Sequence, residues 1–233
     1  IVVGGVWSLV PFEWIEGVLR NGGGQYCDAF STHPYMNYSS PEAGKLEENI
    51  DKMRELLDKY GCENHPIIIS ELGWSAGEAT KITEEQKLSY TMRSAAILQS
   101  RTPLLIWYLG QQKQTTGLEE GFGLIDKSAG VEVPANAKPP LIALSNWNNL
   151  MTNARFDKKI VTNDTDEAIY KFKTEDGRDV LMLWSIEGVK NKISLGLGCD
   201  SMELMDIYGN VTKLFATNGK FDIVLGLQPQ YII

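Results

Sequence analysis

Three consecutive isoleucines, at residues 67–69, lie between Pro66 and Gly73. A short apolar, β-branched run with such boundaries is typical of a strand buried on both faces, as parallel sheets require. The run leads directly to a carboxylate, Glu71. Because α/β folds place their chemistry at the carboxyl ends of parallel strands, we expect Glu71 to reach a cleft at that edge of the sheet.

Strands and helices alternate up to about residue 150. Apolar runs that predict buried strands occupy residues 1–7, 27–33, 67–71 and 104–109, and helical patterns cover residues 13–19, 40–60, 83–102 and 138–150. The second strand should end at His33, because Pro34 cannot continue a central ladder. Strand and helix thus alternate four times, which predicts right-handed βαβ units and a parallel sheet.

Two of the helices have clear starting signals. Ser40 and Pro41 supply a capping hydroxyl and a proline suited to the first helical position. The sequence Thr-Glu-Glu-Gln at residues 83–86 is a capping box. The helix that follows it places Leu88, Met92, Ala95 and Leu98 on one face.

The pattern changes after Asn153. Closely spaced alternating runs predict strands over residues 168–173, 180–184, 192–197, 202–207, 212–215, 221–225 and 230–233. Turn sequences such as Asp-Gly and Asn-Gly separate several of them. We therefore expect two domains, with α/β structure over residues 1–153 and a small antiparallel β-sandwich over residues 154–233.

The charge of the chain argues against polyanionic partners. With 30 acidic and 22 basic residues the formal net charge is −8, so neither nucleic acid nor an anionic membrane is expected as the main partner. The three cysteines form neither a disulfide framework nor a zinc signature, and no metal or organic cofactor is indicated. No apolar stretch approaches the ~20 residues of a membrane span, and no signal peptide is visible.

Taken in order, the motifs resemble those of a known enzyme clan. VVGG, DAFSTHPY, IIISELGWS, LLIWY and FGLID, with KPP downstream, resemble the second half of the (β/α)8 barrel of clan A retaining glycoside hydrolases, especially the xylosidase and β-glycanase families. MDIYGNV and LGLQPQYII resemble the β-sandwich that often follows such barrels. The resemblance covers nearly the whole chain and implies strands five to eight of a TIM barrel, followed by the sandwich.

The resemblance also implies roles at the cleft. In these enzymes the glutamate that ends the seventh strand is the nucleophile, and that position is Glu71 here. A retaining glycosidase keeps this carboxylate ionised, so hydrogen-bond donors should surround it. Tyr35 resembles the tyrosine that orients the nucleophile, and His33 is a second suitable donor. Structural roles for these two side chains, as partners of loop backbone groups, are equally compatible with the sequence.

Three tryptophans are candidates for sugar stacking. Trp107 resembles the aromatic floor under the sugar at the cleavage site, while Trp74 and Trp7 could line neighbouring parts of the cleft. Each lies in or beside an apolar run, so a core position is the alternative for all three.

One expected carboxylate is missing. The acid/base glutamate of this clan follows an asparagine at the end of the fourth strand, and the resemblance places it upstream of Ile1; the chain contains no Asn-Glu pair. Four βα units alone would also leave sheet edges and apolar side chains exposed. The chain could be a fragment whose first half is upstream sequence or another polypeptide, a self-pairing half-barrel, or a non-catalytic remnant. The first explanation is the most economical.

The sequence therefore predicts a glycoside hydrolase for β-linked glycans or glycosides, active once the missing half-barrel is supplied. The alternative is a non-catalytic carbohydrate-binding or scaffolding protein. A secreted or extracytoplasmic location is expected from the resemblance alone.

Overall fold

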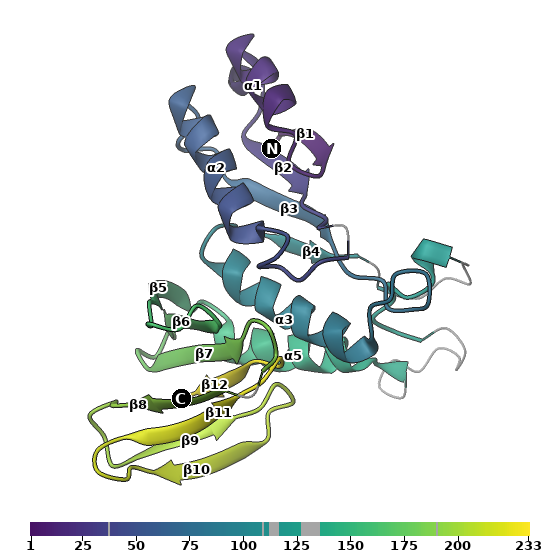
Figure 1. Ribbon diagram of the computed structural model, residues 1–233. Helices are drawn as coiled ribbons and strands as arrows, with labels where there is room; N and C mark the ends of the chain where they lie inside the picture. Colours follow the sequence, from purple (N-terminus) through teal and green to yellow (C-terminus); the bar gives the residue numbers. More distant parts are fainter. Residues whose placement is uncertain (37, 109, 112–116, 127–135, 190) are drawn as a thin grey trace. The chain divides into compact units, whose positions relative to one another are not determined.

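The computed structural model forms two compact units (Figure 1). It describes residues 1–36, 38–108, 110–111, 117–126, 136–189 and 191–233. The first unit comprises Ile1–Glu84 and Ile97–Gly130, and the second comprises Glu85–Ala96 and Val131–Ile233. A domain boundary at residue 153, expected from the change in sequence pattern, stays a prediction.

The first unit is built on a parallel four-stranded sheet whose strand order, β1-β2-β3-β4, equals the sequence order. The strands are β1 (Val3–Ser8), β2 (Ala29–His33), β3 (Ile67–Leu72) and β4 (Leu105–Trp107). Its helices are α1 (Phe12–Arg20), η1 (Gly23–Tyr26), α2 (Leu46–Lys59) and η2 (Gly117–Glu119). Helix α3 (Glu84–Gln99) precedes β4 in the chain, and its residues 85–96 belong to the second unit. The predicted alternation and the parallel sheet are confirmed, so the carboxyl ends of the four strands lie at one edge.

The two outer strands are less buried than their sequences indicated. Val6 in β1 is 60% exposed, Ile106 in β4 is 47% exposed, and Leu104, directly before β4, is also 47% exposed. The expectation of buried strands was wrong here because each outer strand pairs with only one neighbour, β2 or β3. The central strand β3 behaves as expected, since Ile67 and Ile69 are buried. Residue 109, at the end of the expected fourth strand, lies outside the described residues.

Helix α2 begins later than the capping signal suggested. Residues 41–45 form turns, and Lys45 has the left-handed φ of 57°. A Cβ added to Gly44 would lie 2.4 Å from the Cβ of Met36, so close packing holds this turn out of the helical path. The Ser40 hydroxyl accepts a hydrogen bond from the backbone N–H of Ala43 at 3.2 Å and therefore caps the turn. The helix starts only at Leu46.

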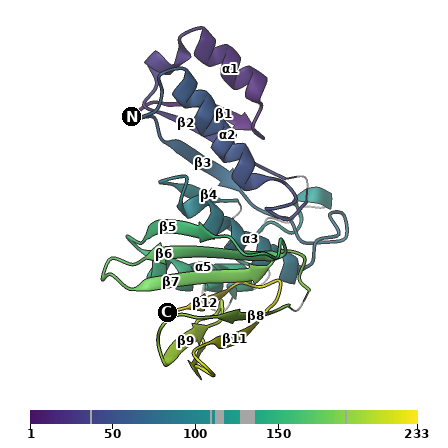
Figure 2. The same cartoon turned by 60° about the vertical axis from the view of Figure 1, so that its left-hand side comes forward.

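The second unit carries two antiparallel sheets (Figure 2). The larger has the order β10-β9-β12-β7-β6-β5, and the smaller pairs β11 with β8. Their strands are β5 (Arg155–Ile160), β6 (Glu167–Lys173), β7 (Asp179–Ser185), β8 (Asn191–Leu195), β9 (Ser201–Met205), β10 (Val211–Phe215), β11 (Phe221–Leu225) and β12 (Gln230–Ile232). The sequence missed only β5, an outer strand with a bulge between Phe156 and Lys158 and with few apolar residues.

Side chains from both antiparallel sheets share one core. The larger sheet contributes residues such as Leu183, and the smaller contributes Ile193 and Phe221, all nearly inaccessible to solvent. Helix α5 (Pro139–Met151) belongs to the same unit. Its Trp147 packs edge-on against Phe172 of β6, with ring centroids 5.7 Å apart.

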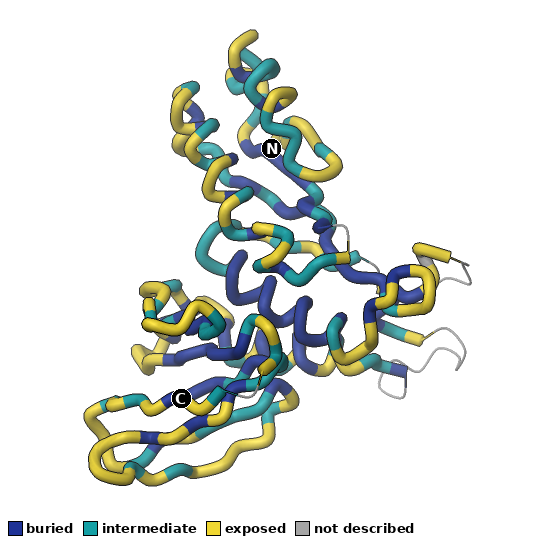
Figure 3. The backbone as a smooth tube through the Cα atoms, viewed as in Figure 1, coloured by how far each residue is buried: buried dark blue, intermediate teal, exposed yellow. Residues whose placement is uncertain are grey.

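Most of helix α3 is buried on all sides rather than on one face (Figure 3). Residues 87–98 are all buried, including Arg93. Within the second unit the Arg93 guanidinium lies over the ring of Trp184 and donates a hydrogen bond to the carbonyl of Ile186 at 3.1 Å. The Ser89 hydroxyl similarly donates to the carbonyl of Leu227 at 2.5 Å. These partners explain how polar residues that would ordinarily face solvent are accommodated in a buried helix.

The buried face of α2 yields a stability prediction. Leu57 has no exposed surface, whereas Glu55, two residues earlier in the helix, is exposed. We expect Leu57→Ala to lower the free energy of unfolding by about 2 to 5 kcal/mol, because it removes packed methyl groups and leaves a cavity. Glu55→Ala should change it by about 0.5 kcal/mol or less. Urea titration followed by circular dichroism measures both, and equal losses would contradict the assigned orientation of α2.

Candidate active site

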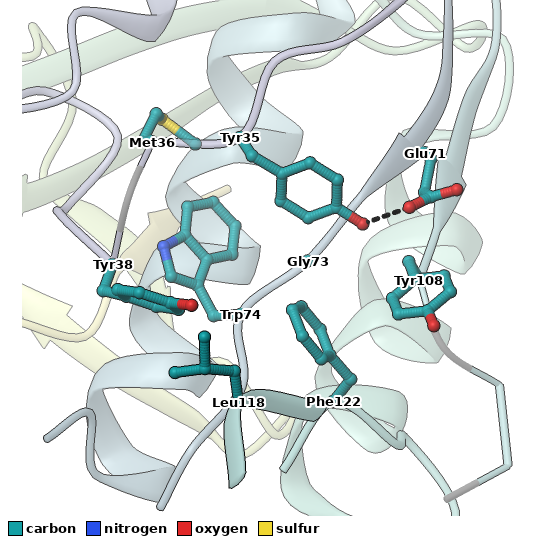
Figure 4. Close-up of a pocket in the computed structure, with 9 residues that line it drawn as sticks. All are labelled: Tyr35, Met36, Tyr38, Glu71, Gly73, Trp74, Tyr108, Leu118 and Phe122. Atoms are coloured by element: carbon teal, nitrogen blue, oxygen red, sulfur yellow. Dashed lines mark hydrogen bonds between the residues drawn. The ribbon is translucent and has the colours of Figure 1, made fainter. Parts of the chain in front are cut away.

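The carboxyl edge of the parallel sheet brings three predicted residues together. His33 is the last residue of β2, Tyr35 follows it, and Glu71 lies at the end of β3. The Tyr35 hydroxyl donates a hydrogen bond to Oε1 of Glu71 at 2.6 Å (Figure 4). Nδ1 of His33 lies 3.6 Å from the other carboxylate oxygen, Oε2. The ends of two adjacent parallel strands thus place the Tyr35 hydroxyl near one oxygen of the Glu71 carboxylate and the His33 imidazole near the other.

Two serines that sequence reasoning missed extend this arrangement. Nε2 of His33 is 3.0 Å from the hydroxyl of Ser70, and that hydroxyl is 2.5 Å from the hydroxyl of Ser31. Ser31 is fully buried, and it pairs with Ile68 in the register between β2 and β3. The signal present in the sequence was a run of three polar residues, Ser31, Thr32 and His33, at the end of a strand predicted to be buried. Only the strand register identifies Ser70 as their partner.

Glu71 opens onto a pocket with mostly aromatic walls (Figure 4). The cavity has a volume of about 250 Å³. It is lined by Tyr35, Met36, Tyr38, Glu71, Gly73, Trp74, Tyr108, Leu118 and Phe122. Among these lining residues of the described chain, Glu71 is the only carboxylate, and its side chain is 33% exposed. The pocket therefore combines one acceptor-only group with flat apolar surfaces, a combination suited to a neutral, hydroxyl-rich ligand.

The aromatic rings of the pocket pack against one another at steep angles. Phe122 meets Tyr35 with centroids 6.1 Å apart and an interplanar angle of 80°, and it meets Tyr108 at 5.0 Å and 75°. Such edge-to-face pairs are favourable beyond the area they bury. Phe122 thereby fixes the ring of Tyr35, whose hydroxyl holds Glu71.

Two glycines allow the pocket walls to approach each other. A Cβ on Gly73 would lie 2.0 Å from the carbonyl oxygen of Tyr108, and one on Gly121 would lie 1.8 Å from that of Ala76. The backbone N–H of Gly121 donates to the buried Ser75 hydroxyl at 3.0 Å. The Gly in the Glu-Leu-Gly-Trp motif is therefore required by packing directly beside the candidate site.

The three candidate tryptophans have different environments. Trp74 lines the pocket but is only 3% exposed, and its indole N–H donates to the carbonyl of Ser39 at 2.9 Å. Trp7 stacks on Phe30, with centroids 6.0 Å apart and an interplanar angle of 9°. Trp107 pairs with Leu72 in the register between β4 and β3. Neither Trp7 nor Trp107 is among the residues that line this pocket, so their contact with a sugar stays a prediction.

No three His, Cys, Asp or Glu side chains of the described residues gather in a way that could hold a metal ion. Within the same residues, no helix is long and apolar enough to cross a membrane.

By sequence, no family model and no curated protein matches the chain. Solved structures do match. A family 39 glycoside hydrolase from the gut symbiont Bacteroides cellulosilyticus WH2 superposes with a TM-score of 0.81 and 21% identity. The match covers 96% of this chain and 48% of that one.

Two further glycoside hydrolases show the same relation. A family 39 β-xylosidase from Caulobacter crescentus matches with a TM-score of 0.60 and 12% identity, over 99% of this chain and 56% of that one. A family 51 arabinofuranosidase from Xanthomonas axonopodis pv. citri matches with a TM-score of 0.64 and 11% identity, over 99% and 57%. The fold of this chain is thus similar to that of these glycoside hydrolases, the kind of enzyme that the motifs resembled, and the chain spans about half of their length.

The packing at Gly73 yields a prediction. Gly73→Ala should lower the free energy of unfolding by about 1 to 3 kcal/mol and alter the near-ultraviolet circular dichroism of the pocket aromatics, because the new methyl group collides with the Tyr108 carbonyl. Gly77→Ala is the matched control, since a Cβ at Gly77 meets nothing within 4 Å. Indistinguishable denaturation curves and spectra for the two variants would show that the backbone approach at Gly73 is not constrained.

Proposed function

We propose that this chain is the carboxyl-terminal part of a retaining glycoside hydrolase that acts on β-linked glycans or glycosides, with Glu71 as the nucleophile. The observation that carries the proposal is the carboxylate at the end of β3, held by the Tyr35 hydroxyl and facing an aromatic pocket. The likeness in fold to glycoside hydrolases of families 39 and 51 supports it.

The proposed reaction gives each group a defined task. One oxygen of the ionised Glu71 attacks the anomeric carbon while the bond from that carbon to the leaving oxygen breaks, and an acid protonates the leaving oxygen. Water then attacks the same carbon, the deprotonated acid takes its proton, and the carboxylate is released. Tyr35 and His33 orient the attacking carboxylate.

The acid/base group is proposed to come from an upstream half-barrel, either preceding sequence or another polypeptide. Retaining chemistry needs a second carboxyl about 5 to 5.5 Å from the first, and Glu71 is the only carboxylate among the described lining residues. In this proposal residues 1–153 form strands five to eight of a (β/α)8 barrel, and residues 154–233 form a β-sandwich. The exposed apolar residues of β1 and β4 support it, because in a closed barrel both strands would gain a second neighbour.

The nucleophile assignment can be tested in a polypeptide that carries the complete barrel. Glu71→Gln should lower kcat for an aryl β-glycoside by several orders of magnitude, since the neutral amide cannot form the glycosyl-enzyme. Glu78→Gln, an exposed position seven residues later, is the matched control and should leave kcat unchanged. Steady-state kinetics measures both, and near-normal turnover by the Glu71 variant would refute the assignment.

A carbohydrate-binding protein without chemistry is the second candidate function. The aromatic pocket with a single carboxylate favours it, because such a site can hold a sugar without completing the two-carboxylate mechanism. Measurable glycan affinity together with no hydrolysis by the complete barrel would support binding over catalysis.

Barrel completion predicts a specific interaction surface. A polypeptide carrying the first four βα units should bind the 26.0 kDa chain, and native mass spectrometry would detect the complex. Ile106→Lys should weaken the complex at least tenfold, because a lysine on an outer strand opposes pairing with a further strand. Val161→Lys, at an 89% exposed position of the second unit, should have no effect. A chain that stays monomeric with that polypeptide, or equal binding by both variants, would contradict the proposal.

A further inference from the structure

The imidazole of His33 lies between two groups of different chemistry. Its Nε2 is 3.0 Å from the Ser70 hydroxyl, and its Nδ1 is 3.6 Å from Oε2 of Glu71. The His33 side chain is only 19% exposed, and the Ser70 hydroxyl has a further partner, the Ser31 hydroxyl, at 2.5 Å. Ser31, Ser70, His33 and Glu71 thus form a continuous polar chain that ends at the candidate nucleophile.

The Glu71 carboxylate, at the end of this series of polar groups, determines which group donates and which accepts each hydrogen bond. An ionised carboxylate can only accept hydrogen bonds, whereas a neutral imidazole has one N–H and one lone pair. If Nδ1 carried the lone pair, two electron-rich groups would face each other across 3.6 Å. With the proton on Nδ1, an N–H instead points at Glu71, and Nε2 becomes an acceptor for the Ser70 hydroxyl. The Ser70 oxygen can then accept from Ser31.

We propose that Ser70, supported by Ser31, is a positioning residue that holds His33 in the tautomer with its proton on Nδ1, facing Glu71. The hydroxyl of Ser70 donates to Nε2 and so makes protonation of that nitrogen unfavourable. Glu71 then has a donor near each oxygen, the Tyr35 hydroxyl at Oε1 and the His33 N–H at Oε2. The tautomer stands on this geometry alone, whereas its importance for catalysis rests on the proposed function.

The other histidine of the chain provides an internal control. Nε2 of His65 lies 2.9 Å from the backbone carbonyl oxygen of Cys27, and a carbonyl can only accept. His65 must therefore carry its proton on Nε2, the opposite nitrogen. Because the sequence contains only two histidines, His33 and His65 can be compared in one spectrum.

The experiment is a long-range ¹H–¹⁵N correlation spectrum of the ¹⁵N-labelled chain, recorded where both rings are neutral. We expect Nδ1 of His33 to resonate as a protonated nitrogen and Nε2 as an unprotonated one, with the reverse pattern for His65. If both rings show the His65 pattern, Ser70 merely accepts a hydrogen bond from His33 and the proposal fails.

Two substitutions of Ser70 separate positioning from simple packing. Ser70→Ala removes the hydroxyl that donates to Nε2, so the His33 signals should shift toward the pattern of a ring protonated on Nε2. Ser70→Thr keeps a hydroxyl on the same strand and should retain the original His33 pattern. The His65 signals should be unchanged in both variants, which controls for loss of the fold. An unchanged His33 pattern in a folded Ser70→Ala variant would overturn the proposal.

Kinetics of the complete barrel distinguishes this inference from the proposed function. Ser70→Ala should lower kcat by about tenfold to a hundredfold with little effect on KM, the scale expected for a misoriented catalytic group, and Ser70→Thr should restore it. Full activity of Glu71→Gln would refute the proposed function and leave the tautomer intact. A large loss in Glu71→Gln, with His33 protonated on Nε2, would refute the tautomer and leave the function intact.

Discussion

The candidate site depends on how a carboxylate is held at the end of a largely buried strand. β3 is apolar up to Ile69, and Glu71 follows as a partly exposed residue directly before the buried Leu72 at the end of the strand. A charged group that is partly removed from water is stabilised by hydrogen-bond donors close to its oxygens. Parallel pairing supplies them, since β2 ends beside β3 and brings His33 and Tyr35 to the two carboxylate oxygens.

The donors are in turn fixed by packing that requires particular small residues. Tyr35 is oriented by Phe122, and the segment of Phe122 can lie close because Gly121 leaves room for the carbonyl of Ala76. Gly73 likewise leaves room for the carbonyl of Tyr108. Positioning of Glu71 therefore extends over β2, β3 and the loop after β4, although only a few side chains touch the carboxylate.

The sequence predicted the parts of this site that have a local pattern. The triple-isoleucine strand and its terminal Glu71 follow from periodicity and boundaries, and the resemblance pointed to Tyr35 and His33. Ser70 escaped prediction because its partner depends on the register between β2 and β3, which no single segment encodes. The late start of α2 escaped for a similar reason, since the packing of Gly44 against Met36 overrides the local capping signal.

The groups that lie close to Glu71 all belong to the first unit. The proposed reaction is therefore divided between this chain and the half-barrel that completes it. Tyr35, His33 and Ser70 come from β2, β3 and the segment directly after β2, so attack on the anomeric carbon is prepared within this chain. Protonation of the leaving oxygen needs a carboxyl on the other side of the glycosidic bond. In the proposed barrel that carboxyl belongs to the half-barrel whose strands pair with β1 and β4. The association that covers the exposed sheet edges therefore also supplies the acid that the reaction needs.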